Sequence, residues 1–167
     1  MRNKKLILSL LLVAAALGVA SLILARWKDY VFDQDGFAIS APARPTVGRR
    51  VIATEFGPVD MHDYDIGLGD SGALGVYVSD HGNDMLKVDP KLVLRSCISG
   101  GTLISEREIS LQGFPGLAWE AEDKKAHYTW RAYAVRTKVY QVLVVTPIGK
   151  PYDGTARFQN SFRLLAK

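Results

Sequence analysis

The 167-residue chain has very little cysteine, and its single cysteine lies far from either end. Cys97 has no second cysteine to pair with, so a disulfide within the chain and a multi-cysteine zinc site are both excluded. No cysteine stands near residue 25, where the long apolar run ends, so that end cannot accept the lipid of a lipoprotein. Seven prolines and fifteen irregularly spaced glycines exclude a collagen-like chain.

Acidic residues are absent from the first 28 positions, which contain five lysines and arginines. Without these five the remaining chain has a net charge of −1, so the basic pI near 9.2 comes from the amino-terminal segment. Nucleic-acid binding requires a basic face on the folded domain. We therefore expect no nucleic acid among the partners.

Residues 6–25 form an apolar run of 20 residues that contains no charge and only two serines. A helix of this length spans about 30 Å, which matches the hydrocarbon core of a bilayer. The run predicts a single-pass transmembrane signal-anchor that contacts membrane lipid, with residues 1–5 as its cytoplasmic n-region. Three basic residues precede the run and two follow it, which places the rest of the chain outside the cytoplasm.

Two other interpretations of this run stay open. Gly18-Val19-Ala20 before Ser21 is a passable cleavage site, and cleavage there would give a secreted protein. The run continues through Ala25, which is longer than a signal peptide needs and favours the uncleaved anchor. A buried core helix is the third interpretation.

Beyond the run, residues 26–36 are predicted to form a juxtamembrane stalk and residues 37–167 a single globular domain. Asp89 as cap and Pro90 at the first position predict a helix to about residue 98, and a closing helix follows Pro151. Alternating apolar residues and turn signals predict strands at 37–41, 50–56, 58–68, 75–79, 103–111, 116–122, 127–136 and 139–146.

The predicted strand 139–146 is apolar on both faces. Val139, Leu143 and Val145 share one face, which Gln141 interrupts. Tyr140, Val142 and Val144 share the other face. A strand of this kind belongs at the centre of a sheet that is covered on both sides.

Four segments resemble PsbP-like domains, a superfamily of photosystem extrinsic proteins, transport factors and bacterial envelope proteins. They are GFAISAPARP (Gly36–Pro45), LQGFPGLAWE (Leu111–Glu120), WRAYAVRTKVYQVLVV (Trp130–Val145) and ARFQNSFRLL (Ala156–Leu165). The resemblance implies an α+β fold in which a central antiparallel sheet lies between helices as an α/β/α sandwich. The metal and chloride role of the photosynthetic members rests on residues that have no match in this sequence.

A cluster of acidic residues with one histidine is the best metal candidate. On a strand, Asp60 and His62 face one way and Asp63 and Asp65 the other, so each face offers only two ligands. Leu74 stands where a calcium loop opening at Asp63 needs its bidentate glutamate. We expect a solvated edge or loop here and assign no metal or cofactor. The cluster comprises Asp60, His62, Asp63, Asp65 and Asp70.

Three further patterns have simpler interpretations than catalysis, so no catalytic residue is assigned. Gly69-Asp70-Ser71-Gly72 echoes a serine-protease signature but is expected to be a polar turn. Cys97, with His127 as its only base candidate, is expected to be a core cysteine. His81 and Asp84 are expected in a surface turn.

Charge is divided unevenly along the domain. Residues 29–92 have a net charge of −6 and residues 93–167 a net charge of +5. The domain is dipolar if the two halves present different faces, whereas the dipole cancels if sheet neighbours interleave them. Interleaving is our expectation.

Together these features predict a membrane-anchored, extracytoplasmic accessory domain for binding or assembly that has no catalytic activity. One alternative is a small envelope metal-binding protein or hydrolase that uses the Asp60–Asp70 segment. Another is a structural subunit of a membrane complex. The protein partner or ligand is not named by the sequence.

Overall fold

The computed structural model describes residues 27–54 and 57–166. The predicted membrane span, residues 6–25, lies outside these residues. Within the two described ranges, none of the helices combines the length and the apolar character needed to cross a bilayer.

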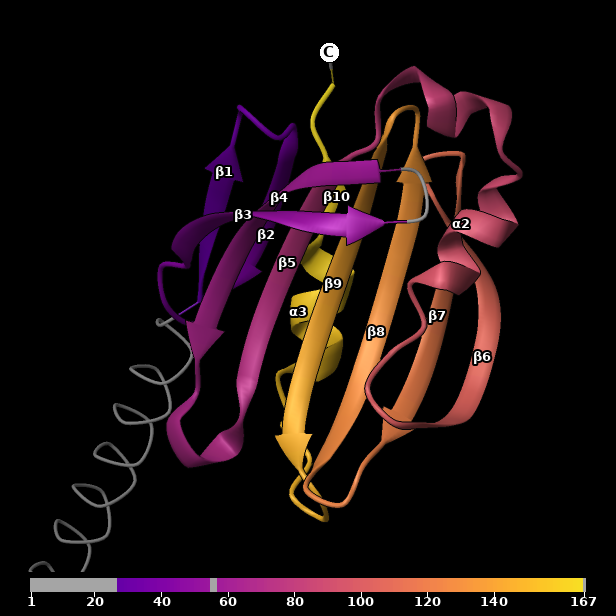
Figure 1. Ribbon diagram of the computed structural model, residues 1–167. Helices are drawn as coiled ribbons and strands as arrows, with labels where there is room; N and C mark the ends of the chain where they lie inside the picture. The colour runs from indigo at the N-terminus through magenta and orange to yellow at the C-terminus, as the bar shows by residue number, and fades with distance from the viewer. Residues whose placement is uncertain (1–26, 55–56, 167) are drawn as a thin grey trace, which may run out of the picture.

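The largest element is a seven-stranded antiparallel sheet with the strand order β3-β4-β5-β9-β8-β7-β6 (Figure 1). Strands that follow one another along the chain are neighbours in this sheet, except that β5 pairs with β9 rather than with β6. The strands are β3 (Thr46–Thr54), β4 (Gly57–Gly67), β5 (Ala73–Asp80), β6 (Thr102–Leu111), β7 (Phe114–Glu122), β8 (Ala126–Val135) and β9 (Lys138–Pro147).

Strand β9 lies at the centre of this sheet, as its two apolar faces predict. Val139 packs into the hydrophobic cluster on one face, and Tyr140, Val142 and Val144 pack into the cluster on the other. The predicted strands all recur; the strand at residues 37–41 keeps both of its ends, and each of the others is shifted at one end or both. The largest shift is in β3, which begins at Thr46 rather than residue 50.

A second, three-stranded sheet covers one face of the large sheet. It has the order β1-β2-β10 and consists of β1 (Lys28–Phe32), β2 (Phe37–Ala41) and β10 (Arg163–Leu164). β1 pairs with β2 along its whole length, although its residues fall in the segment expected to be a stalk. That segment is therefore part of the folded domain from residue 28 onward.

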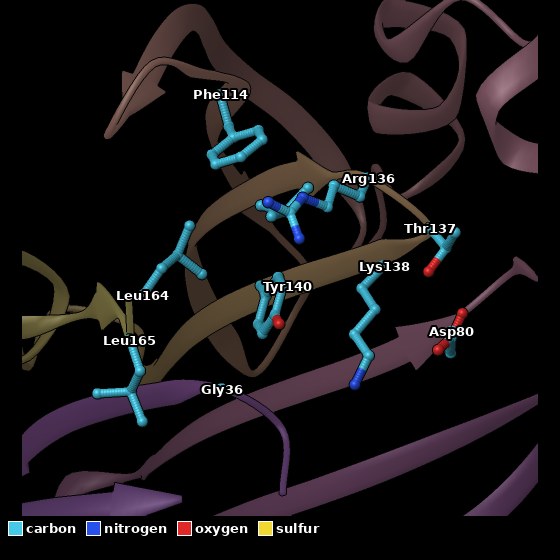
Figure 2. Close-up of a pocket in the computed structure, with 10 residues that line it drawn as sticks. Gly36, Asp80, Phe114, Arg136, Thr137, Lys138, Tyr140, Leu164 and Leu165 are labelled. Carbon is cyan, nitrogen blue, oxygen red and sulfur yellow. The ribbon is translucent and has the colours of Figure 1, made fainter. Parts of the chain in front are cut away.

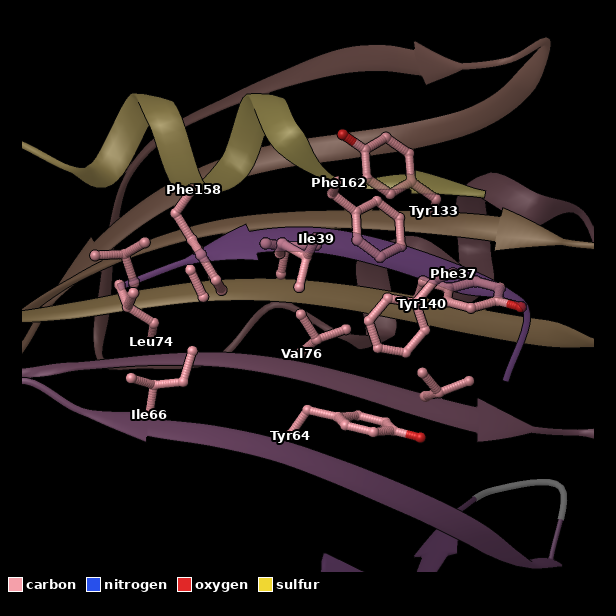
Figure 3. Packing of buried hydrophobic residues seen from close by; sticks show 14 residues of the cluster. Phe37, Ile39, Tyr64, Ile66, Leu74, Val76, Tyr133, Tyr140, Phe158 and Phe162 are labelled. Atoms are coloured by element: carbon pink, nitrogen blue, oxygen red, sulfur yellow. The ribbon is translucent and has the colours of Figure 1, made fainter. Parts of the chain in front are cut away.

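The helix α3 (Thr155–Ser161) follows Pro151 as predicted and packs beside β2. The Ser161 hydroxyl donates to the Ser40 carbonyl and accepts from the Ser40 amide at 2.9 Å. Phe158 of α3 and Phe37 and Ile39 of β2 point into one core with the aromatic and aliphatic side chains of β4, β5 and β9 (Figure 3). This core joins the small sheet, α3 and the large sheet.

The opposite face of the large sheet is covered over β7, β8 and β9 by α2 (Pro90–Ser96) and the 3-10 helix η2 (Gly82–Lys87). Asp89 caps α2 as predicted, because its side chain accepts from the Lys91 amide at 2.9 Å. Val93 and Leu94 of α2 pack on Trp119 of β7.

The prediction of an α/β/α sandwich is wrong. Residues 27–54 and 57–166 are mostly β, and the two α-helices among them have seven residues each. One outer layer is chiefly the small sheet, because β1 supplies a strand where the sequence indicated only a linker. Two packed antiparallel sheets with short helices describe the architecture.

The strand order separates the two oppositely charged halves of the sequence instead of interleaving them. β3, β4 and β5 come from the acidic half and lie together, while β6 to β9 come from the basic half and lie together. The expected interleaving of strands from the two halves is therefore absent from the seven-stranded sheet.

Candidate functional site

A cleft of about 340 Å³ opens at the end of the sheets where the β1–β2, β6–β7 and β8–β9 turns meet the C-terminal segment (Figure 2). The β1–β2 turn contributes Gly36, the β8–β9 turn contributes Arg136 and Thr137, and the C-terminal segment contributes Leu164 and Leu165. Its volume is at the lower end of the roughly 300–1,000 Å³ that is usual for small-molecule sites. The cleft is lined by Gly36, Asp80, Phe114, Val135, Arg136, Thr137, Lys138, Tyr140, Leu164 and Leu165.

Backbone hydrogen bonds fix the C-terminal wall of the cleft. The Leu164 amide donates to Gln112 Oε1 at 2.8 Å, and Gln112 Nε2 donates to the Leu164 carbonyl at 3.3 Å. The Leu165 amide donates to the Gly36 carbonyl at 2.9 Å. The wall is thus held from the β6–β7 turn on one side and the β1–β2 turn on the other.

Arg136 is the least constrained charge in the cleft. Its side chain is exposed, and it has no hydrogen bond or ion pair to any residue that the structure describes. Figure 2 shows the side chain extending over the space between Phe114 and Tyr140. Its backbone φ is 56°, in the left-handed region that costs an L-residue roughly 1–2 kcal/mol.

A buried carboxylate lies next to the cleft, in the turn that follows β1. The side chain of Asp35 is only 4% exposed. Asp35 Oδ2 lies 2.7 Å from His62 Nδ1 and accepts a hydrogen bond from the Tyr64 hydroxyl, and Asp35 Oδ1 lies 3.5 Å from Lys138 Nζ. The Tyr140 hydroxyl donates to the Asp35 carbonyl at 2.7 Å. This group, which we call the Asp35 cluster, ties β1–β2 to β4 and β9.

The hydrogen bonds of the Asp35 cluster decide its protonation. Burial by itself would raise the pKa of Asp35, but the donors on Tyr64 and His62 outweigh it and hold the pKa below the usual range. Burial, with the nearby Asp35 charge, raises the pKa of Tyr140 to about 12. Burial and the same carboxylate raise the pKa of Tyr64 as well. The cluster therefore carries an ionised aspartate among neutral tyrosines at neutral pH.

A second cavity of about 210 Å³ lies beside the cleft and shares Asp80 and Lys138 with it. Asp35, Asp60 and His62 also line this cavity. Two members of the predicted acidic cluster, Asp60 and His62, therefore lie close to the cleft, a position that no local sequence pattern predicts.

The structure gives three carboxylates of the predicted acidic cluster separate partners. Asp60 pairs with Arg49 at 2.6 Å, Asp63 with Arg50 at 3.3 Å, and Asp65 accepts from the Tyr77 hydroxyl at 3.0 Å. Asp70 lies in η1 (Gly69–Ser71), the turn between β4 and β5. Among residues 27–54 and 57–166, three His, Cys, Asp or Glu side chains never come together as a metal-binding group.

The remaining candidate residues are placed as follows. Gly69 to Ser71 form the polar turn η1, as predicted. Both ring nitrogens of His127 face carboxylates, with Nδ1 2.9 Å from Glu122 and Nε2 3.7 Å from Glu120. Asp84 lies in η2, where it pairs with Lys87 at 2.8 Å. His127 and Asp84 thus have charged neighbours inside the protein, and their positions do not require a bound ligand.

Cys97 lines a wider groove of about 700 Å³ between β3 and α2, together with His81 and Ser79. The Cys97 thiol donates to the Val93 carbonyl at 3.4 Å, and burial raises its pKa to about 11, so the thiolate is scarce at neutral pH. His81 Nε2 lies 2.9 Å from Ser79 Oγ. We therefore favour the 340 Å³ cleft as the candidate site, because the Arg136 side chain there is exposed and has no partner among the described residues.

Two of the residues that define the site were not singled out from the sequence. Asp35 resembled an ordinary turn residue before Gly36, and its contacts depend on the small sheet packing over β4. Arg136 lies in the turn predicted between two strands. The available signal was an arginine at a position where a tight turn favours glycine.

No protein-family model matches the chain, and a comparison with curated proteins found no match either. Among solved structures, the chain is similar to the solution structure of cyanobacterial PsbP (CyanoP) from Synechocystis sp. PCC 6803. The two share 15% identity with a TM-score of 0.48, over 84% of this chain and 93% of that chain. At this identity the likeness concerns the structure alone.

Proposed function

We propose that this protein is a non-catalytic binding domain, held outside the cytoplasm by residues 6–25, that takes up its ligand or partner in the Arg136 cleft. The observation that carries the proposal is the cleft itself, which combines a free cation with apolar walls. Pockets that are largely apolar and contain a few placed polar groups are the usual form of a binding site.

The position of the cleft agrees with an anchored domain. β1 begins at Lys28 and runs toward the turn that contributes Gly36 to the cleft, a path of about 16 Å for five strand residues. In Figure 1 the β1–β2 turn, the β8–β9 turn and β10 all lie at the end of the domain away from the start of β1. A chain anchored through residues 6–25 would present the cleft away from the membrane.

The absence of catalysis is part of the proposal and is supported by how the reactive groups are used. Asp35 is occupied by His62, Tyr64 and Lys138 inside the fold. The half-buried Cys97 thiol donates to the Val93 carbonyl, and burial raises its pKa. Catalysis requires a nucleophile or base within reach of a substrate and in the right protonation state.

The test uses the full-length chain in cells that lack the native copy. Thr137→Trp places a bulky side chain in the cleft lining and is expected to abolish complementation. Lys124→Trp, in the exposed turn between β7 and β8, is the matched control and should complement normally. Full complementation by Thr137→Trp at normal abundance would contradict the proposal.

The location is tested separately in intact spheroplasts. Protease added from outside should digest the domain, whereas digestion only after lysis would contradict the proposed orientation. Mass spectrometry of the mature chain distinguishes an anchor from a cleaved signal, because a chain that starts at Ser21 would be secreted.

A further inference from the structure

The chain contains two non-glycine residues with left-handed backbone among those that the structure describes, and both stand in turns beside the cleft. Gln112 has a φ of 50° and Arg136 a φ of 56°. A residue held in a sparsely populated conformation persists where the surrounding structure over-determines it, and such residues cluster at active and ligand-binding sites.

The role of Gln112 lies within the protein, because its amide bonds to both backbone groups of Leu164. Arg136 has no such partner in the described part of the chain. A contact inside the fold thus explains the left-handed backbone of Gln112. For Arg136, the same backbone conformation points to a contact with a molecule outside the fold.

From this contrast we infer that Arg136 binds the carboxylate of an amphipathic monoanion whose apolar part lies against Phe114, Leu164 and Leu165. This inference rests on the proposed binding function and names the chemical class of its ligand. The guanidinium fork matches the two oxygens of a carboxylate.

The charges of the cleft favour a single negative charge on the ligand. Lys138, the second cation in the lining, already lies 3.5 Å from Asp35 and points away from Arg136 toward the β1–β2 turn (Figure 2). Asp80 adds a negative charge to the lining and would repel a dianion. Of the two cations in the lining, Arg136 therefore remains to pair with a negative charge on the ligand. The apolar wall beside Arg136 selects against a small hydrophilic anion.

The test measures binding of 3-phenylpropionate to the full-length chain in detergent micelles, with 3-phenylpropionamide as the uncharged counterpart. The signal is the Arg136 Nε–Hε resonance of a chain labelled with nitrogen-15 arginine, identified by its loss in Arg136→Gln. Titration to about 10 mM covers the millimolar affinity expected of a small ligand in a cleft of this size. We expect the acid to bind at least about tenfold more tightly than the amide.

Variants separate the charge from the cleft. Arg136→Gln should weaken binding of the acid at least about tenfold and leave the amide unchanged. Arg107→Gln, an exposed arginine of β6, is the control for a general loss of charge and should bind like the wild type. Leu165→Ala should weaken both compounds, because it removes part of the apolar wall.

An acetylated tripeptide that ends in phenylalanine, with a free or amidated C-terminus, identifies the source of the carboxylate. Tighter binding of the free peptide than of 3-phenylpropionate points to a protein C-terminus, and weaker binding points to a small free acid. Both results require Arg136 and support the inference.

Equal affinity for the acid and the amide, or unchanged acid binding by Arg136→Gln, would overturn the inference and leave the cleft as a binding site. Binding of neither compound at the highest concentration would also overturn it. Failure of the proposed function is a different result, namely full complementation by the Thr137→Trp variant.

Discussion

His62 Nδ1 lies 2.7 Å from Asp35 Oδ2, which joins the central part of β4 to the turn between β1 and β2 of the small sheet. The carboxylate has a side-chain exposure of 4% and the imidazole one of 19%. Removal of one member of a buried polar pair leaves the other without its partner. The Asp35 cluster is therefore a buried polar contact that positions the small sheet over the large one.

Asp35→Asn should lower the free energy of unfolding by about 1–3 kcal/mol, because it removes the charge that His62 and Lys138 face. Denaturant unfolding of the full-length chain in micelles measures the change. Asp33→Asn, an exposed aspartate in the same turn, is the control and should change it by less than about 0.5 kcal/mol. Equal losses in the two variants would show that the turn, rather than the cluster, is sensitive.

Acid should lower the stability of the wild type through protonation of Asp35. The pKa of Asp35 is lower in the folded chain than its ordinary value of 3.8, so its contribution to stability is present above that value and is lost as the pH falls through the folded pKa. Melting temperatures of the wild type and Asp35→Asn should converge as the pH drops below about 4. A constant difference down to pH 2 would contradict this.

His81 should give a separate pH dependence at a higher pH. Burial lowers its pKa below 6.5, opposed in part by Asp80, so the folded chain favours the neutral imidazole. Stability from this residue is full above pH 6.5 and declines as the pH falls through the folded pKa, since the unfolded chain binds the proton more readily. His81→Gln should flatten the decline of melting temperature below pH 6.5. An unchanged slope in the variant would assign the effect to another group.

The two stacked tryptophans of β7 and β8 should differ in their contribution to stability. Their rings lie 5.3 Å apart at 13°, but Trp119 is 1% exposed whereas Trp130 is only partly buried. Trp119→Ala should lower the free energy of unfolding by about 3–5 kcal/mol and Trp130→Ala by less. A double-mutant cycle should give a coupling of about 0.5–1.5 kcal/mol for the stack. The opposite order of the single variants would contradict the assigned burial.

Glycine at the two left-handed positions should have opposite effects. Arg136→Gly removes backbone strain and no internal contact, so it should raise the free energy of unfolding by up to about 1 kcal/mol. Gln112→Gly relieves similar strain but loses two hydrogen bonds to Leu164, so it should lower it by about 1 kcal/mol. Equal changes would indicate that the Gln112 contacts contribute nothing.

Local signals in the sequence predicted most of the large sheet. Asp89 and Pro90 located α2, and the two apolar faces of residues 139–146 located the central strand. The small sheet was not predicted, because β1 is short and mostly exposed, and its partner β2 shows no local sign of pairing with it. Its absence from the prediction led to the incorrect α/β/α architecture.

The site was harder to predict than the fold, because it depends on contacts between distant segments. His62 was identified as a candidate ligand, but Asp35 reaches it only when the β1–β2 turn packs over β4. The cleft brings together turns after β1, β6 and β8 with the C-terminal segment. None of these turns contains a sequence motif that predicts its contact with the other turns.

The junction of β5 with β9 has a consequence for the order of folding. Each half of the large sheet is a run of hairpins between strands adjacent in sequence, which close rapidly because their loops are short. The pairing of Ala73–Asp80 with Lys138–Val145, and of β2 with β10, must wait until remote segments meet. Because non-local pairing slows folding, these two junctions are expected to set the rate at which the chain reaches its native state.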